Sequence, residues 1–267
     1  MRKRRLLLFS LLLSPGGFSC VGQTGGNAID FPVAAAGPAS AILGQPLSCT
    51  NDGNWDITLT QATMHIGAIY LDQSRPISGG QATGCYLTGT YVAQETSALD
   101  VDLLSPDPQL FPADAHGITY PPALVGQVWL THGDINTIAD RLPVLQVAGT
   151  ATQAASAYPF TAALTIGSNR QASGGAVAGG DPICKERIVS PISTAVTIQP
   201  TGGLLLTVDP CRLFTNVDFS QLGPGATPGT YAFSDNPTSA GYTQPSQNLY
   251  GNLRNTRPYT FSWTPNP

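Results

Sequence analysis

The sequence predicts an all-β fold: an antiparallel β-sandwich, immunoglobulin-like or jelly-roll-like, with long loops and at most one short helix. Charged residues make up only 10% of the 267 residues, and the chain holds two lysines and two glutamates, too few for ordinary surface helices. The 29 glycines and 23 prolines supply frequent turns. Between them lie short runs rich in Val, Ile, Leu and Thr, a spacing that is typical of strands in a sandwich or barrel.

Composition divides the chain into three parts. Residues 1–19 are predicted to be a signal peptide and residues 20–50 a tether, because the latter are small, polar and rich in Gly and Pro. Residues 51–267 are predicted to form a single β-sandwich domain. Within it, the segment 223–248 is rich in Gly, Pro, Ser, Thr, Asn and Gln, which predicts a long loop.

The first twenty residues predict export. Four basic residues (2–5) precede an apolar stretch (6–13) that is too short to be a membrane helix, and the segment ends in Ser19-Cys20. This ending resembles the signal of bacterial lipoproteins, in which a small residue precedes a cysteine that becomes the lipidated N-terminus. The resemblance implies lipidation of Cys20 and a place at the outer membrane or cell surface. Ordinary cleavage after Ser19 is the alternative, and it would give a periplasmic or secreted protein.

Removal of residues 1–19 changes the charge. Four of the 12 basic residues are lost and eight remain against 16 acidic residues, so the mature chain is near −8. Such a chain repels phosphate backbones, and a nucleic-acid partner is not expected.

The even number of cysteines that remains after lipidation predicts disulfides. Lipidation of Cys20 leaves Cys49, Cys85, Cys184 and Cys211, and thiols tend to pair outside the cytoplasm. Three pairings are possible. The expected one joins Cys49 to Cys85 and Cys184 to Cys211, since each bond then closes a loop of roughly 30 to 40 residues. Free buried thiols are the alternative.

The strand pattern is clearest over residues 55–71, where the buried face changes phase near Gln61 and Ala62. A β-bulge or a turn produces such a slip. The spacing of Ile, Ala and Leu over 134–142 predicts the one helix, and residues 201–203 predict a hairpin turn. Further strands are predicted at 86–94, 99–104, 125–132, 144–152, 160–166, 192–199, 204–209, 213–219 and 259–263.

Three histidines are candidate metal ligands, because imidazole suits copper and zinc. They are His65, His116 and His132. On a regular strand His65 shares its face with Ile69 and Leu71, and His132 shares its face with Val128 and Leu130. Two histidines on such apolar faces could meet across a sheet. Hydrogen-bonded, half-buried structural histidines are the alternative interpretation.

Two weaker patterns suggest other ligands. Asp100 and Asp102 lie on one face of a predicted strand, a spacing that calcium sites can use, although capping and turn roles are the alternative. The aromatic and amide residues of the segment 223–248 have the composition of sugar-binding loops, with an ordinary surface loop as the alternative. The residues concerned are Tyr231, Phe233, Tyr242, Gln244, Gln247 and Asn248.

No catalytic motif is present: there is no G-x-S-x-G, no H-E-x-x-H and no phosphate-binding glycine loop with Lys. We therefore expect a non-catalytic binding or structural protein of the cell envelope, with a membrane partner through its lipid anchor and an envelope protein or glycan as a further partner. A metal-binding protein is the alternative. A hydrolase that uses an aspartate or a histidine is the third hypothesis.

Overall fold

The computed structural model describes residues 25–74, 90–133, 141–166, 187–236, 238–239, 241–265 and 267. These residues form three sheets, none closed into a barrel, and one α-helix, so the predicted all-β sandwich is confirmed. The predicted helix over 134–142 falls largely outside the described residues, and the signal peptide with Cys20 does so entirely. The described part of the chain contains no helix with the length and hydropathy needed to cross a bilayer.

The six-stranded sheet is antiparallel throughout. Its strands, in spatial order, are β1 (Ala28–Phe31), β9 (Ala115–Ile118), β6 (Tyr91–Glu95), β5 (Ala68–Asp72), β10 (Ala123–Trp129) and β13 (Ile188–Val196).

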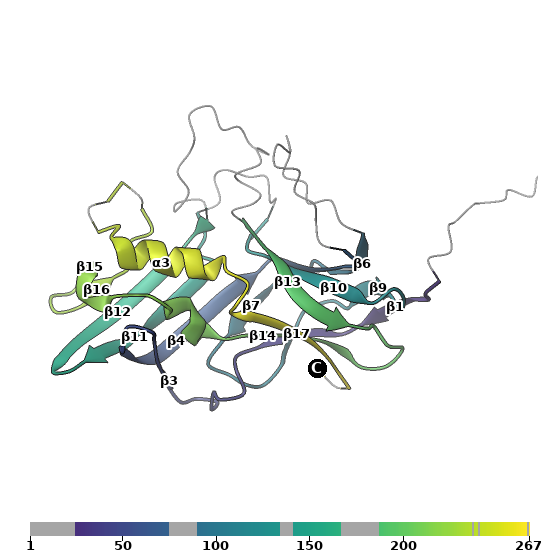
Figure 1. The fold of residues 1–267 in the computed structure, drawn as a ribbon, viewed down its shortest axis with the longest axis horizontal. Coiled ribbons are helices and arrows are strands. Elements are labelled where there is room, and N and C mark those ends of the chain that lie inside the picture. Colours follow the sequence, from purple (N-terminus) through teal and green to yellow (C-terminus); the bar gives the residue numbers. More distant parts are fainter. Residues whose placement is uncertain are drawn as a thin grey trace, which may run out of the picture.

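The seven-stranded sheet contains the longest strands, and one of its pairs, β12 with β16, is parallel. Its strands are β15 (Gly223–Pro224), β16 (Tyr231–Ala232), β12 (Ser156–Leu164), β11 (Leu145–Gln153), β4 (Asp56–Ile66) and β3 (Leu47–Thr50), and β7 (Leu99–Asp102) pairs with β4 beyond the end of β3. In Figure 1 this sheet lies on the left and the six-stranded sheet on the right.

The four-stranded sheet also contains one parallel pair, β14 with β2, so the sandwich is built from antiparallel and mixed sheets. Its order is β17 (Tyr259–Thr264), β14 (Gly203–Val208), β2 (Val33–Ala36) and β8 (Gln109–Leu110). It packs against the inner face of the six-stranded sheet. A Cβ atom added to Gly126 of β10 would lie 2.1 Å from the Phe261 ring of β17, so glycine is required there.

The predicted tether over 20–50 is wrong for residues 28–50. Within this range, residues 28–31, 33–36 and 47–50 form β1, β2 and β3, and Val33, Ala34 and Ala35 of β2 are almost fully buried. Small residues in this segment serve close packing in the core, where the parallel pairing with β14 leaves little space.

The predicted loop over 223–248 is wrong in part. It contains β15 and β16 and the start of α3 (Gln244–Leu253), which packs on the 3-10 helix η1 (Pro210–Phe214). Figure 1 shows α3 lying over the part of the seven-stranded sheet that contains β12. The predicted strand over 213–219 is likewise wrong, because η1 and a second 3-10 helix, η2 (Phe219–Gln221), occupy its two ends and the residues between them form no strand.

The predicted hairpin at 201–203 is also wrong. Gly202 does have the positive φ that its sequence suggested, +97°, but β14 after it pairs with β17 and β2, whereas β13 before it belongs to the six-stranded sheet. The turn therefore carries the chain from one layer of the sandwich to the other.

Two phase slips decide which side chains of the central strands face outward. The slip predicted near Gln61 is confirmed as a β-bulge, because Thr60 is an extra residue between the partners of Ala148 and Gly149 on β11. A second slip occurs at Gly67, between β4 and β5. A Cβ atom there would lie 2.1 Å from the carbonyl oxygen of Thr131. The residues that belong to the apolar core change from Met64 and Ile66 before Gly67 to Ile69 and Leu71 after it.

Candidate binding site

The outer face of the six-stranded sheet carries a row of polar and aromatic side chains. On β5, Ile69 and Leu71 belong to the core, so Tyr70 and Asp72 point to the opposite face. On the neighbouring strand β10, Gln127 pairs with Tyr70. Directly paired residues of an antiparallel ladder share a face, so Gln127 lies beside Tyr70 on the outside.

The same face extends across β10 and β6. Trp129 of β10 follows Gln127 by two residues and shares its face. On β6, Tyr91 pairs with Asp72, and Gln94 pairs with Tyr70. The registers therefore gather Tyr70, Asp72, Tyr91, Gln127 and Trp129 on one surface, and we call these five residues the outer-face cluster.

Three aromatic rings form the exposed part of the outer-face cluster. The ring centroid of Tyr70 lies 4.7 Å from that of Tyr91 and 4.5 Å from that of Trp129, with interplanar angles of 37° and 39°. All three residues are half-buried. The rings thus form a continuous apolar and electron-rich surface that remains in contact with solvent.

A chain of hydrogen bonds lies within the cluster. The Trp129 indole Nε1–H donates to Gln127 Oε1 at 3.0 Å, and Gln127 Nε2 donates to Asp72 Oδ2 at 2.6 Å. Gln127 and Asp72 are both fully buried. The indole therefore fixes the orientation of the Gln127 amide, and that amide in turn fixes one oxygen of the carboxyl group.

The other oxygen of Asp72, Oδ1, is buried and has no hydrogen-bond partner. Burial raises the pKa of Asp72 to about 6, although the bond from Gln127 acts in the opposite direction. An unpartnered buried acceptor is rare in folded proteins and is a common feature of functional sites. Asp72 is the strongest sign of function on this face.

Glu95 adds a second buried carboxyl group on the adjacent strand. Its Oε1 accepts hydrogen bonds from the backbone N–H of Ser97, at 2.8 Å, and from the Ser97 hydroxyl, while Oε2 is buried without a partner. The pKa of Tyr70 is raised by burial and, to a lesser extent, by the negative charge of Glu95. The field of Glu95 therefore reaches the aromatic rings of the outer-face cluster.

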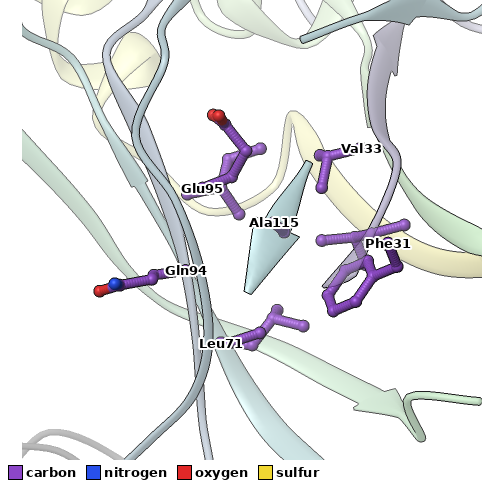
Figure 2. Close-up of a pocket in the computed structure, with 9 residues that line it drawn as sticks. Phe31, Val33, Leu71, Gln94, Glu95 and Ala115 are labelled. Atoms are coloured by element: carbon purple, nitrogen blue, oxygen red, sulfur yellow. The ribbon is translucent and has the colours of Figure 1, made fainter. Parts of the chain in front are cut away.

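Glu95 also lines a hollow between the six-stranded and four-stranded sheets. Figure 2 shows Phe31, Val33 and Leu71 around it, and Gln94 pointing away from it toward the outer face. The hollow is too narrow to hold a water molecule. It is a gap in core packing and not a ligand site.

The structure brings together two of the three candidate histidines. The rings of His65 and His132 stack with their centroids 3.6 Å apart and an interplanar angle of 13°. His65 Nδ1 lies 2.7 Å from Asp100 Oδ1, and the second ring nitrogen of His65, Nε2, is buried without a partner. His132 Nε2 donates to the carbonyl oxygen of Pro143 at 2.8 Å. His116 lies elsewhere, on β9, and its Nδ1 is 2.8 Å from Asp30 Oδ1.

The prediction that His65 shares a face with Ile69 and Leu71 is wrong. Those two residues lie in the core, whereas the slip at Gly67 turns His65 outward. Across the described ranges, no three His, Cys, Asp or Glu side chains converge as a metal site would require.

The candidate aspartates have structural partners. Asp100 contacts His65, and Asp102 Oδ1 accepts from the backbone N–H of Leu104, so the two aspartates whose spacing suggested a calcium site contact different neighbours. Asp209 and Asp218 cap η1 and η2. The Ser220 hydroxyl bond, more than other causes, lowers the pKa of Asp218.

The predicted sugar-binding aromatics of the segment 223–248 are used in packing. Phe233 is 4% exposed, and its ring lies 5.7 Å from Phe160 in the core. The Tyr231 ring lies 4.9 Å from Tyr158.

Sequence reasoning missed the outer-face cluster. Its signal was the i, i+2 spacing of Tyr70 with Asp72, and of Gln127 with Trp129, which puts polar and aromatic side chains on one face of a strand.

The disulfide pairing differs from the expected one. Cys49 of β3 is bonded to Cys211 of η1, with 6.2 Å between their Cα atoms. The expected pairs, Cys49 with Cys85 and Cys184 with Cys211, are therefore wrong. Cys85 and Cys184 lie outside the described residues.

Comparisons with known proteins identify no relative. No family model matches the chain, and no curated protein or solved structure is significantly similar to it.

Proposed function

We propose that this protein is an exported, lipid-anchored bacterial envelope protein that binds a ligand on the outer-face cluster. The N-terminal sequence supports export and lipidation of Cys20. The single observation that supports the binding role is the buried Asp72 carboxyl group, whose Oδ1 has no partner and which lies on the same face as three half-exposed aromatic rings.

The energetics of Asp72 support a ligand rather than a purely structural role. Burying an acceptor without a hydrogen bond costs about 1 to 3 kcal/mol. An apolar residue would avoid this cost. A carboxyl group on the same face as the aromatic rings has a physical role if a ligand that binds there interacts with its charge.

The anchor is tested on the mature protein. Mass spectrometry of the N-terminal peptide should show Cys20 as the first residue, carrying a lipid, and Cys20→Ser should release the protein from the membrane fraction. A mature chain that begins at Cys20 without lipid would favour ordinary cleavage, and a cytosolic chain with its N-terminal arginines intact would disprove export.

The binding role is tested by cross-linking in living cells. A photoreactive amino acid at Gln94, an exposed neighbour of Tyr70 on the same face, should capture an envelope component. Trp129→Ala should abolish capture, while the same probe at the exposed Ile42, in a distant loop, should not capture it. Capture from both positions, or capture that survives loss of Trp129, would contradict the proposed site.

A second candidate function is metal binding at His65, favoured by the Asp100 contact. A carboxylate that binds one ring nitrogen is the usual outer partner of a metal-bound histidine, and it leaves Nε2 as the ligand atom. The His65 and His132 rings are stacked, so their nitrogen atoms do not point toward a common position. Both could bind one copper or zinc ion only if the exposed His132 ring turned. Calorimetric titration with Cu²⁺ and Zn²⁺ tests this: binding should be lost in His65→Ala and retained in the control His116→Ala.

A further inference from the structure

We propose that the ligand of the outer-face cluster carries a quaternary ammonium group, which binds on the rings of Tyr70, Tyr91 and Trp129 above the Asp72 carboxylate. This inference rests on the proposed binding function and specifies the chemical class of the ligand. The faces of aromatic rings attract cations through their quadrupole, and Trp and Tyr do so more strongly than Phe.

The arrangement of the three rings supports cation binding. Tyr70 lies in the middle, within 4.7 Å of Tyr91 and 4.5 Å of Trp129, and tilts of 37° and 39° mean that the three ring planes are not parallel. At these distances the rings contact one another, so a rounded cation would bind on the outward surface that they share and not between them.

The unpaired negative charge near the rings also supports a cationic ligand. Asp72 and Glu95 are both buried, each has one oxygen without a hydrogen bond, and neither forms an ion pair with a Lys or Arg side chain of the described residues. Buried carboxylates are normally paired with a cation. A cationic ligand would supply the missing charge.

The burial of Asp72 does not prevent this interaction. Coulomb attraction in the low dielectric of a protein interior acts over several ångströms and needs no direct contact. Glu95 on the neighbouring strand acts in this way on the Tyr70 hydroxyl, whose pKa is raised first by burial and second by this charge. A cation seated on the rings would experience the negative charges in the same way.

A quaternary ammonium fits better than a primary one. An –NH₃⁺ group brings three N–H donors that need acceptors when they leave water, and the one acceptor oxygen of Asp72 without a partner is fully buried. A quaternary ammonium has no N–H, so ring faces and a nearby negative charge satisfy it completely.

The test compares two ligands of the same shape. The full mature protein is titrated with choline and with 3,3-dimethyl-1-butanol, which replaces the charged nitrogen by carbon, and binding is followed by calorimetry and tryptophan fluorescence at pH 8. We expect saturable binding of choline, about tenfold or more tighter than that of the neutral alcohol. Equal binding of both, or no saturable binding of choline, would overturn the inference.

Variants locate the binding. Trp129→Phe keeps a ring and should weaken choline binding, Trp129→Ala should abolish it, and Asp72→Asn should weaken it about tenfold by removing the charge. The exposed Tyr120, outside the cluster, provides the control Tyr120→Ala, which should bind as the wild type does. Because Asp72→Asn preserves shape, it answers the question even if Trp129→Ala fails to fold.

The affinity for choline should also fall as the pH drops below about 6, because protonation of Asp72 removes its charge. The other titratable groups around it are Tyr70, Tyr91 and Glu95, and Asp72→Asn should reduce the pH dependence. If choline fails to bind while capture from position 94 still depends on Trp129, the ligand class is wrong and the binding function stands.

Discussion

Asp72 is the residue that most clearly departs from ordinary folding chemistry. Its pKa is raised from 3.8 to about 6 because burial favours the neutral form. The folded state therefore binds its proton more tightly than the unfolded chain does. The stability that this gives is fully present below pH 4 and is lost as the pH rises through about 6.

Replacing Asp72 by Asn should remove this cost. A shift of roughly two pKa units corresponds to about 3 kcal/mol, so Asp72→Asn should be up to that much more stable than the wild type at pH 8 and equally stable at pH 4. Urea unfolding at both pH values measures the difference. The control Asp52→Asn, on an exposed loop, should change neither value. An Asp72→Asn variant that is destabilised at pH 8 would show that the carboxylate has a partner after all.

At the scale of elements, the passage from β4 to β5 sets the binding face. Without the slip at Gly67, the core residues Met64 and Ile66 would be continued by Ala68, Tyr70 and Asp72, which would then point inward. Gly67 makes this slip possible because its backbone approaches Thr131 too closely for any side chain.

Gly67→Ala should therefore destabilise the protein by about 3 kcal/mol or more, since a backbone oxygen cannot move aside as a side chain does. Gly133→Ala is the matched control, because a Cβ atom there meets nothing within 4 Å. Thermal unfolding of both variants gives the comparison. A Gly67→Ala variant as stable as Gly133→Ala would mean that the close approach at Thr131 does not constrain the slip.

The sequence was informative wherever the pattern was local. The bulge near Gln61 could be predicted, because burial alternates on either side of it. The slip at Gly67 could not, because its cause is the distant Thr131. The tether prediction failed for a related reason: Ala34, Ala35 and Ala36 are small and lack strong strand propensity, and only their pairing with β14 places them in the core.

The binding site could likewise be predicted only where its pattern is local in the sequence. Tyr70 with Asp72, and Gln127 with Trp129, are visible as i, i+2 pairs in the sequence. Their meeting across β5 and β10 is a matter of strand order, which a single sequence does not give. The expectation that two of the histidines could meet is confirmed for His65 and His132, whose rings stack, while His116 lies elsewhere on β9. Metal binding by these residues stays a prediction.

At the scale of the whole molecule, the Cys49–Cys211 disulfide joins residues 162 positions apart. It ties β3, at an edge of the seven-stranded sheet, to η1, against which α3 packs. On the chain-entropy model, closing so long a loop stabilises the folded state by about 5 kcal/mol.

We expect Cys49→Ala/Cys211→Ala to unfold at a markedly lower urea concentration than the wild type. Peptide mapping without reduction should yield one linked peptide that contains both residues. A map that joins Cys49 to Cys85 would contradict the structure, and an unchanged urea midpoint in the double variant would contradict the stabilising role.

The claim that the outer-face cluster is a ligand site is tested most directly by NMR of the three tryptophan indole N–H groups. Trp129 belongs to the cluster, whereas Trp55 is buried in the core and Trp263 lies on β17; Trp129→Phe assigns its signal. On titration with choline, the Trp129 signal should shift saturably while the other two stay in place. A Trp129 signal that does not move, or three signals that move together, would contradict the account.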